Sequence, residues 1–272
     1  MGTTIRGGGV PERPALGEVV PLATYSPGGF SPLDIDGLHL WLDATSLALS
    51  DGDAVGTWED KGPDGYDVTQ STSSKKPVFK TGIIGGGPIL RFDGVDDFLT
   101  HDVVSWQASD LAYTMFLVVR TSLGAGSQEV VFSSCAGAAF IPLWGIYTNL
   151  VGGGTPEAPG AFRWSPGVTD KSTTSIIDGN PHIFLAQSQN PGRLWRLDGA
   201  VDVNATTGDV GGPATKPTGR TNIAVGCYNR ATEDSHFGGD VGEIIYYDSA
   251  LGSDDIADVE SYLSSKWGIS IP

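Results

Sequence analysis

The sequence predicts an all-β protein, a two-sheet antiparallel sandwich with an extended N-terminal arm and a short C-terminal helix. Two observations lead to this prediction. Apolar segments of strand length recur between Gly, Asn, Asp and Pro clusters, and 39 Gly and 17 Pro among 272 residues are typical of many short strands joined by tight turns. Strands do not alternate with long helical segments, which argues against a parallel βαβ layout.

Residues 1–33 differ in composition from the rest of the chain. They are rich in Gly, Pro, Ser and Thr and show no sustained hydrophobic period. Such a segment cannot bury enough apolar surface to fold alone. It is either a solvated tail or an arm that becomes ordered against a partner through short apolar clusters such as Val19–Val20. We predict an anchoring arm over 1–33 and a β-sandwich over 34–272.

The strand pattern becomes regular from Leu38 onward. Residues 113–121, YTMFLVVRT, are apolar on both faces, which is typical of a central strand covered on each side. Two antiparallel sheets stacked face to face accommodate this pattern. Further strands are expected at 129–135, 182–188, 193–199, 222–228 and 241–251.

One helix is predicted, at the C-terminus. Ser253 is expected as its N-cap, with Asp254 and Asp255 in the first turn, where the helix dipole favours anions. Lys266 lies in the last turn and Gly268 can end the helix. An apolar stripe at helical spacing, which we expect to pack on the sandwich, consists of Ile256, Val259, Leu263 and Trp267.

The charge balance limits the partners. The chain has 16 basic and 32 acidic residues, a formal net charge of −16, so clustered basic contacts to nucleic acid are not expected. No apolar run reaches the ~18 residues that span a bilayer, and no secretory signal opens the chain. We therefore predict neither nucleic-acid nor membrane binding, and synthesis in the cytoplasm without export by the general route.

The two cysteines, Cys135 and Cys227, are too few for a disulfide framework. Both lie in apolar, strand-like segments. Buried thiols and a single bridge between them are both compatible with the sequence.

Three segments carry a family resemblance. They are 37–70, which opens GLHLWLDA, 76–99, which ends LRFDGVDDFL, and 238–269, which ends VESYLSSKWGI. In order and spacing they resemble the concanavalin A-like, laminin-G-like jelly-roll family, of the kind found in bacteriophage structural proteins and bacterial surface proteins. Residues 121–182 match poorly and 1–33 do not match. The resemblance implies a concanavalin A-like jelly-roll sandwich.

The segment RFDGVDDFL, residues 91–99, concentrates three acids around a glycine. We predict a hairpin turn at Asp93–Gly94, with Asp96 and Asp97 entering the next strand. Two alternatives stay open. Carboxylates and turn carbonyls are ligands for hard cations, so Asp96 and Asp97 are candidate Ca²⁺ ligands, and the acids could also be catalytic. No other cofactor is predicted.

Catalytic patterns are scarce in this chain. Some relatives on the jelly-roll architecture cleave polysaccharides with carboxylates that alternate along one strand and share acid and nucleophile roles. Here Asp240, Glu243 and Asp248 are irregularly spaced, and no nucleophile elbow, phosphate loop or zinc motif occurs. We predict no catalytic residues and no enzymatic activity, while an enzyme built from scattered loops stays open.

A carbohydrate-binding role requires aromatic rings beside polar side chains. The candidate ligand-binding residues are Trp164, Tyr228, Asn229, Arg230 and His236. For Trp164, a place in the hydrophobic core is an equal alternative.

Together these features favour a non-enzymatic virion surface protein of a tailed bacteriophage, a capsid decoration or fibre-type protein. Residues 1–33 would bind other virion proteins, and the sandwich would face outward, bind glycans and self-associate as a homo-oligomer on the virion surface. The absence of an export signal, the resemblance and the arm motivate this hypothesis. The alternatives are a glycan-binding module of a bacterial surface protein and a polysaccharide-degrading enzyme.

Overall fold

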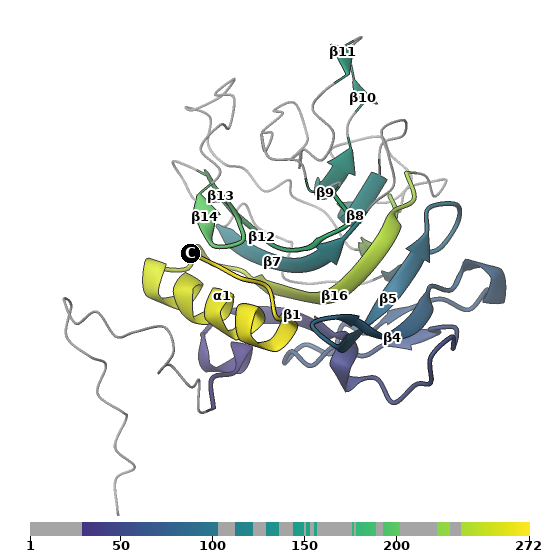
Figure 1. The fold of residues 1–272 in the computed structure, drawn as a ribbon, viewed down its shortest axis with the longest axis horizontal. Helices are drawn as coiled ribbons and strands as arrows, with labels where there is room; N and C mark the ends of the chain where they lie inside the picture. The colour runs from purple at the N-terminus through teal and green to yellow at the C-terminus, as the bar shows by residue number, and fades with distance from the viewer. Residues whose placement is uncertain are drawn as a thin grey trace, which may run out of the picture. The chain divides into compact units, whose positions relative to one another are not determined.

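The computed structural model describes residues 29–102, 112–121, 129–135, 144–149, 151–152, 155–156, 176, 178–188, 193–201, 222–228 and 235–272. Within these ranges two antiparallel sheets form a sandwich that is completed by one C-terminal helix, α1 (Ser253–Trp267) (Figure 1). The predicted fold class is confirmed. In the described ranges, no helix is both long and apolar enough to cross a bilayer.

The larger sheet contains eight strands among the described residues. Its order is β14 (Ala200–Val201), β13 (Arg193–Leu197), β12 (Pro181–Ser188), β7 (Tyr113–Arg120), β16 (Gly238–Tyr247), β5 (Gly87–Asp93) and β4 (Val78–Ile84), and β1 (Leu38–Asp43) also pairs with β16. The segment predicted as a central strand is β7, which lies between β12 and β16 and is buried from Tyr113 to Val119.

The smaller sheet has six strands in the described ranges. Their order is β2 (Thr57–Trp58), β3 (Val68–Thr69), β6 (Leu99–His101), β15 (Asn222–Val225), β8 (Glu129–Cys135) and β9 (Trp144–Asn149). A two-stranded ribbon, β10 (Val151–Gly152) and β11 (Thr155–Pro156), and three short 3₁₀ turns, η2 (Pro32–Asp34), η3 (Ala44–Ser46) and η4 (Ser73–Lys75), complete the described elements.

Strand β16 organises the larger sheet. One edge pairs with β7, while the other pairs with β5 over Gly238–Val241 and with β1 over Glu243–Tyr247. The register against β7 shifts between Val241 and Glu243, so Gly242 forms a bulge.

This bulge determines which side chains share a face. Asp240 lies opposite Arg120, and Glu243 lies opposite Val118, two residues earlier on β7. Because residues two apart on a strand project to the same side, Asp240 and Glu243 project from the same face although they are three positions apart in the chain. This is the outer face of the sheet, on which α1 packs.

The helix covers part of that outer face. Figure 1 shows α1 on one side of β7 and β16, and β8 and β9 on the other. The predicted apolar stripe is buried, and Gly268 ends the helix with a left-handed φ of 65°. The predicted N-cap was wrong by one residue: Gly252 occupies the cap position, without a side-chain hydrogen bond, and Ser253 is the first helical residue.

The connection after β5 also differs from the prediction. β5 ends at Asp93, and the next strand, β6, begins at Leu99 in the smaller sheet. The segment is therefore not a hairpin but a corner that carries the chain from one sheet to the other. Gly94 adopts the expected positive φ of 76°, whereas Asp96 and Asp97 precede β6 instead of entering it.

The compact unit that contains the sandwich begins at Ser31. Ser31 and Asp34 form a capping box around η2, and the Tyr247 hydroxyl donates a hydrogen bond of 3.0 Å to the Pro32 carbonyl. Most of the predicted arm, residues 1–28, lies outside the described residues, so the boundary at 33/34 stays a prediction. Cys227 is fully buried and forms no disulfide, and the strand register places Cys135 opposite Asn222, so of the two alternatives the bridge is wrong and the buried thiol is confirmed for Cys227.

We predict that Gly242→Val destabilises the protein. A Cβ at Gly242 would lie 2.9–3.1 Å from three ring atoms of Trp267, whose side chain is buried. Overpacking of this kind costs about 1–3 kcal/mol of unfolding free energy. Chemical denaturation measures the loss. Gly252→Ser is the matched control, since a Cβ there meets nothing within 4 Å; equal stability of the two variants would contradict the bulge packing.

Candidate functional site

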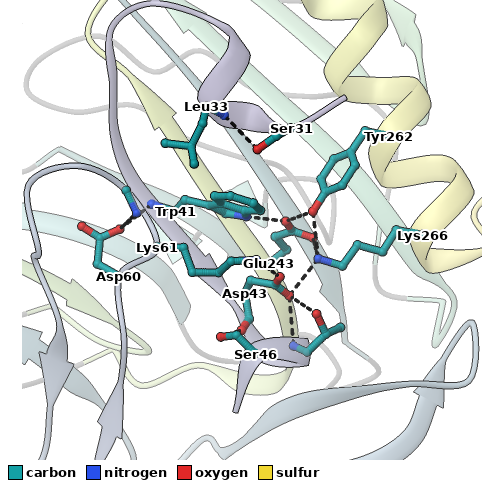
Figure 2. A network of polar contacts seen from close by, with 12 residues as sticks. Ser31, Leu33, Trp41, Asp43, Ser46, Asp60, Lys61, Glu243, Tyr262 and Lys266 are labelled. Atoms are coloured by element: carbon teal, nitrogen blue, oxygen red, sulfur yellow. Dashed lines mark hydrogen bonds and ion pairs between the residues drawn. The ribbon is translucent and has the colours of Figure 1, made fainter. Parts of the chain in front are cut away.

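Glu243 is the polar centre of the interface between helix and sheet. Its side chain is 1% exposed. Oε1 accepts hydrogen bonds from Trp41 Nε1 at 2.6 Å and the Tyr262 hydroxyl at 2.8 Å. Oε2 accepts from Trp267 Nε1 at 2.7 Å and Lys266 Nζ at 2.8 Å. Figure 2 shows Tyr262 and Lys266 reaching from α1 to this carboxylate, and Trp41 reaching it from β1.

A second carboxylate, that of Asp43, extends the network. Lys266 Nζ lies 2.8 Å from Asp43 Oδ1, and Lys61 Nζ lies 2.8 Å from Asp43 Oδ2 and 3.7 Å from the centre of the Trp41 ring. Burial alone would raise the pKa of Asp43, but Lys266 and Lys61 hold it below its ordinary value. Burial raises the pKa of Glu243, although Lys266 opposes this. Both carboxylates are at most 2% exposed, so the network binds α1 to the sheet and offers no room for a substrate.

A pocket of about 390 Å³ involves the neighbouring half of β16. It lies over the pairing of β16 with β5 and β7, where Gly238 and Gly239 contribute no side chain to the floor. A Cβ on Gly239 would lie 2.6 Å from the Arg120 carbonyl oxygen. The lining residues are Arg91, Phe92, Asp93, Arg120, Thr121, Gly179, Gly238, Gly239 and Asp240.

A row of three charged side chains crosses this pocket. The strand register places Asp240 of β16 directly opposite Arg91 of β5 on one side and Arg120 of β7 on the other. Arg91 donates through Nε to Oδ1 at 2.7 Å and through a terminal nitrogen to Oδ2 at 3.1 Å. Arg120 donates to Oδ2 through Nε at 2.9 Å, and a terminal nitrogen forms an ion pair with the same oxygen at 2.6 Å.

The three side chains differ in exposure, and this difference determines which of them can contact a ligand. The Asp240 side chain is 4% exposed, whereas those of Arg91 and Arg120 are 43% and 28% exposed. The buried carboxylate therefore orients two guanidinium groups that reach solvent. Oriented guanidinium groups are strong hydrogen-bond donors to hydroxyl and carboxylate oxygens of a ligand.

The carboxylates at the corner after β5 cluster beside the pocket. Asp93 Oδ1 accepts the amides of Val95, Asp96 and Asp97, and Asp97 Oδ2 accepts the amide of Asp93 at 3.0 Å. These bonds match the backbone role predicted for the corner. One oxygen from each of Asp93, Asp96 and Asp97 also lies within 4.8 Å of the others, a spacing that a cation could bridge. Ca²⁺ binding by Asp96 and Asp97 stays a prediction.

The ligand-binding residues predicted from sequence are not gathered in this pocket. Trp164, Asn229 and Arg230 lie outside the described residues. Tyr228 is 2% exposed and presents little ring surface to a ligand. His236 is half-buried, with its ring centre 6.2 Å from that of Phe98. All five stay predictions.

Sequence reasoning missed the row because its members are far apart in the chain. Arg91 and Arg120 are 149 and 120 residues from Asp240. The available signal was the acid Asp240 in a largely apolar strand, because a carboxylate that is costly to bury needs a charged partner opposite.

Comparisons with known proteins define the fold class. No family model and no curated protein sequence matches the chain. Among solved structures, Trypanosoma rangeli sialidase in complex with sialic acid is 14% identical (TM-score 0.50), and 88% of this chain covers 34% of that one. The binding domain of Paraclostridial Mosquitocidal Protein 1 is 9% identical (TM-score 0.54), with 84% and 53% covered.

A third structure, domain 4 of a GH43 extracellular arabinanase from Geobacillus stearothermophilus in complex with arabinotriose, is 15% identical, with 82% and 98% covered and a TM-score of 0.48. The chain spans about one third of the length of the sialidase. At these identities the likeness shows the fold alone: the protein is an antiparallel β-sandwich domain.

We predict a pH-dependent stability that originates at Asp97. Burial, and then the charges of Asp93 and Asp96, raise the pKa of Asp97 to about 6. Between the ordinary value of 3.8 and about 6, the folded state keeps a proton that the unfolded chain has lost, so this carboxyl destabilises the fold as pH rises through that window. Asp97→Asn should flatten the decline in melting temperature between pH 4 and 6.

The matched control is the exposed Asp36→Asn, which should leave the wild-type pH profile in place. A wild-type decline that persists in Asp97→Asn would show that other groups cause it.

Proposed function

We propose that the chain is a non-catalytic, glycan-binding β-sandwich module, and that the pocket over β5, β16 and β7 is its ligand site. The observation that carries this proposal is the row Arg91–Asp240–Arg120, in which one buried carboxylate presents two guanidinium groups to solvent.

The size and the polar groups of the pocket suit a saccharide, while Phe92, the one aromatic residue among its described lining residues, is buried. Its volume of about 390 Å³ lies within the ~300–1,000 Å³ of small-molecule sites. Guanidinium groups supply donors, and the Asp93 carboxylate and strand carbonyls supply acceptors, which together suit a ligand rich in hydroxyl groups. Asp240 fixes both arginines before binding, so little side-chain entropy is lost when a ligand arrives.

The carboxylates on this face favour binding over catalysis. A glycosidase needs two carboxyl groups that flank an open substrate gap at ~5–9.5 Å. Asp240 is engaged by two arginines, and Glu243 by four donors under α1. Asp43 is held by two lysines and is also buried. Each of these three buried carboxylates is engaged by its partners, so none is placed to contact a glycosidic oxygen and transfer a proton to it.

The structural comparisons support the proposal at the level of the fold. A sialidase solved with sialic acid and a domain described as a binding domain share the sandwich. The sialidase's activity belongs to a chain of which this protein covers 34%, so only the architecture is carried over.

Binding to a glycan array followed by calorimetry tests the proposed site. We expect wild-type protein to bind a subset of glycans and Arg120→Gln to bind them at least 10-fold more weakly, because the variant loses one charged donor, worth ~1.5–3 kcal/mol. Lys76→Gln removes the same charge outside the pocket and should bind as wild type. The site assignment fails if Arg120→Gln binds equally well, and the function fails if no glycan is bound.

A narrower proposal concerns where the module works. We propose display on the virion of a tailed bacteriophage, with the N-terminal segment bound to other virion proteins and the sandwich self-associated there. The family resemblance and the start of the compact unit at Ser31 support it. Removal of residues 1–30 should leave the melting temperature unchanged and abolish co-sedimentation with particles. A truncated protein that still sediments with particles would remove this proposal.

A further inference from the structure

We infer that the ligand of the pocket is an acidic saccharide and that its carboxylate binds between Arg91 and Arg120. This inference rests on the proposed glycan-binding function and specifies its ligand class. Three observations carry it: the charges of Arg91, Asp240 and Arg120, the arginine N–H groups that Asp240 does not engage, and the position of the neighbouring acids.

The row holds one excess positive charge. Two guanidinium groups face a single carboxylate, and the four contacts between 2.6 and 3.1 Å are made by the Nε atoms and one terminal nitrogen of each arginine. A guanidinium group carries five N–H donors, so each arginine keeps donors beyond those that Asp240 engages. Asp240 itself is buried, which leaves the arginines as the groups that meet a ligand.

Two further acids, Asp51 and Asp93, lie near this charge. Asp51 is ion-paired with Lys80 at 2.5 Å. Asp93 lies two residues beyond Arg91 on β5 and lines the pocket, but its Oδ1 accepts three amides of its own corner. The four charged side chains of the described lining therefore balance formally, two arginines against Asp93 and Asp240, and the two guanidinium groups are the positive groups in the pocket with N–H donors beyond those that Asp240 engages.

This arrangement favours a single carboxylate over a densely charged polyanion. Arginine and carboxylate form two parallel charge-assisted hydrogen bonds, each roughly twice as strong as a neutral bond. A heavily sulfated chain would place further anions beside Asp93 and against a protein of net charge −16, which repels them. A uronic acid has one carboxylate per sugar, so it can pair with the arginines without placing further anions on the same sugar.

Matched saccharides test the ligand class. Titration calorimetry at pH 7 compares oligogalacturonate with its carboxyl-reduced form, alongside a sulfated dextran oligosaccharide, which carries sulfates but no carboxylate, and inorganic phosphate. We expect the acid to bind at least 10-fold more tightly than the reduced form and than the other two probes. Arg91→Gln and Arg120→Gln should abolish this preference, and Lys76→Gln should keep it.

Arg91→Lys separates charge from geometry, because it keeps the charge but loses the planar fork. An intermediate preference is expected, in a variant whose melting temperature shows that it is folded. If the acidic and reduced sugars bind equally and Arg120→Gln weakens both, the proposal of an acidic ligand is wrong and the proposed glycan site is kept. If the sulfated oligosaccharide or phosphate binds as tightly as the acidic sugar or more tightly, the proposed preference for a carboxylate is wrong. Failure to bind any saccharide on the array overturns the glycan-binding function itself.

Discussion

The structure depends on a buried carboxylate that must be fully paired. Glu243 is removed from water at the centre of the larger sheet, and an unpaired charge there would cost several kcal/mol. Four donors meet it, one from β1 and three from α1. The helix is therefore held on the sheet by directional bonds as well as by its apolar stripe, and the position of one residue on β16 fixes where α1 can lie.

The same strand divides the outer face into a closed and an open half. The bulge at Gly242 aligns Asp240 and Glu243 on one face and leaves room for the Trp267 ring between them. On the closed side, α1 covers Glu243. On the open side, Asp240 keeps a buried carboxylate beneath two exposed arginines. Two acids three positions apart thus differ in role: Glu243 holds α1 on the sheet, and Asp240 orients the two arginines of the pocket that we propose as a ligand site.

Local patterns predicted much of the fold. The apolar segment 113–121 predicted a central strand, and the stripe ending at Trp267 predicted the helix and its packing on the sandwich. They could not predict pairing partners, because those depend on contacts between distant segments. The corner at Asp93 has the composition of a hairpin turn, yet its flanking strands belong to different sheets. For the same reason the row of Arg91, Asp240 and Arg120 was not visible from spacing, whereas the turn at Asp93–Gly94 was.

The stability of Glu243→Gln tests the central claim most directly. An amide cannot accept from all four donors, and breaking a buried ion pair costs ~3–5 kcal/mol. We therefore expect a loss of roughly 3 kcal/mol or more, with hydrogen exchange in Ser253–Trp267 accelerated more than in β7, while the exposed Glu59→Gln behaves as wild type. A variant within about 0.5 kcal/mol of the wild type, the ordinary range for a surface change, with unchanged exchange in α1, would contradict the account.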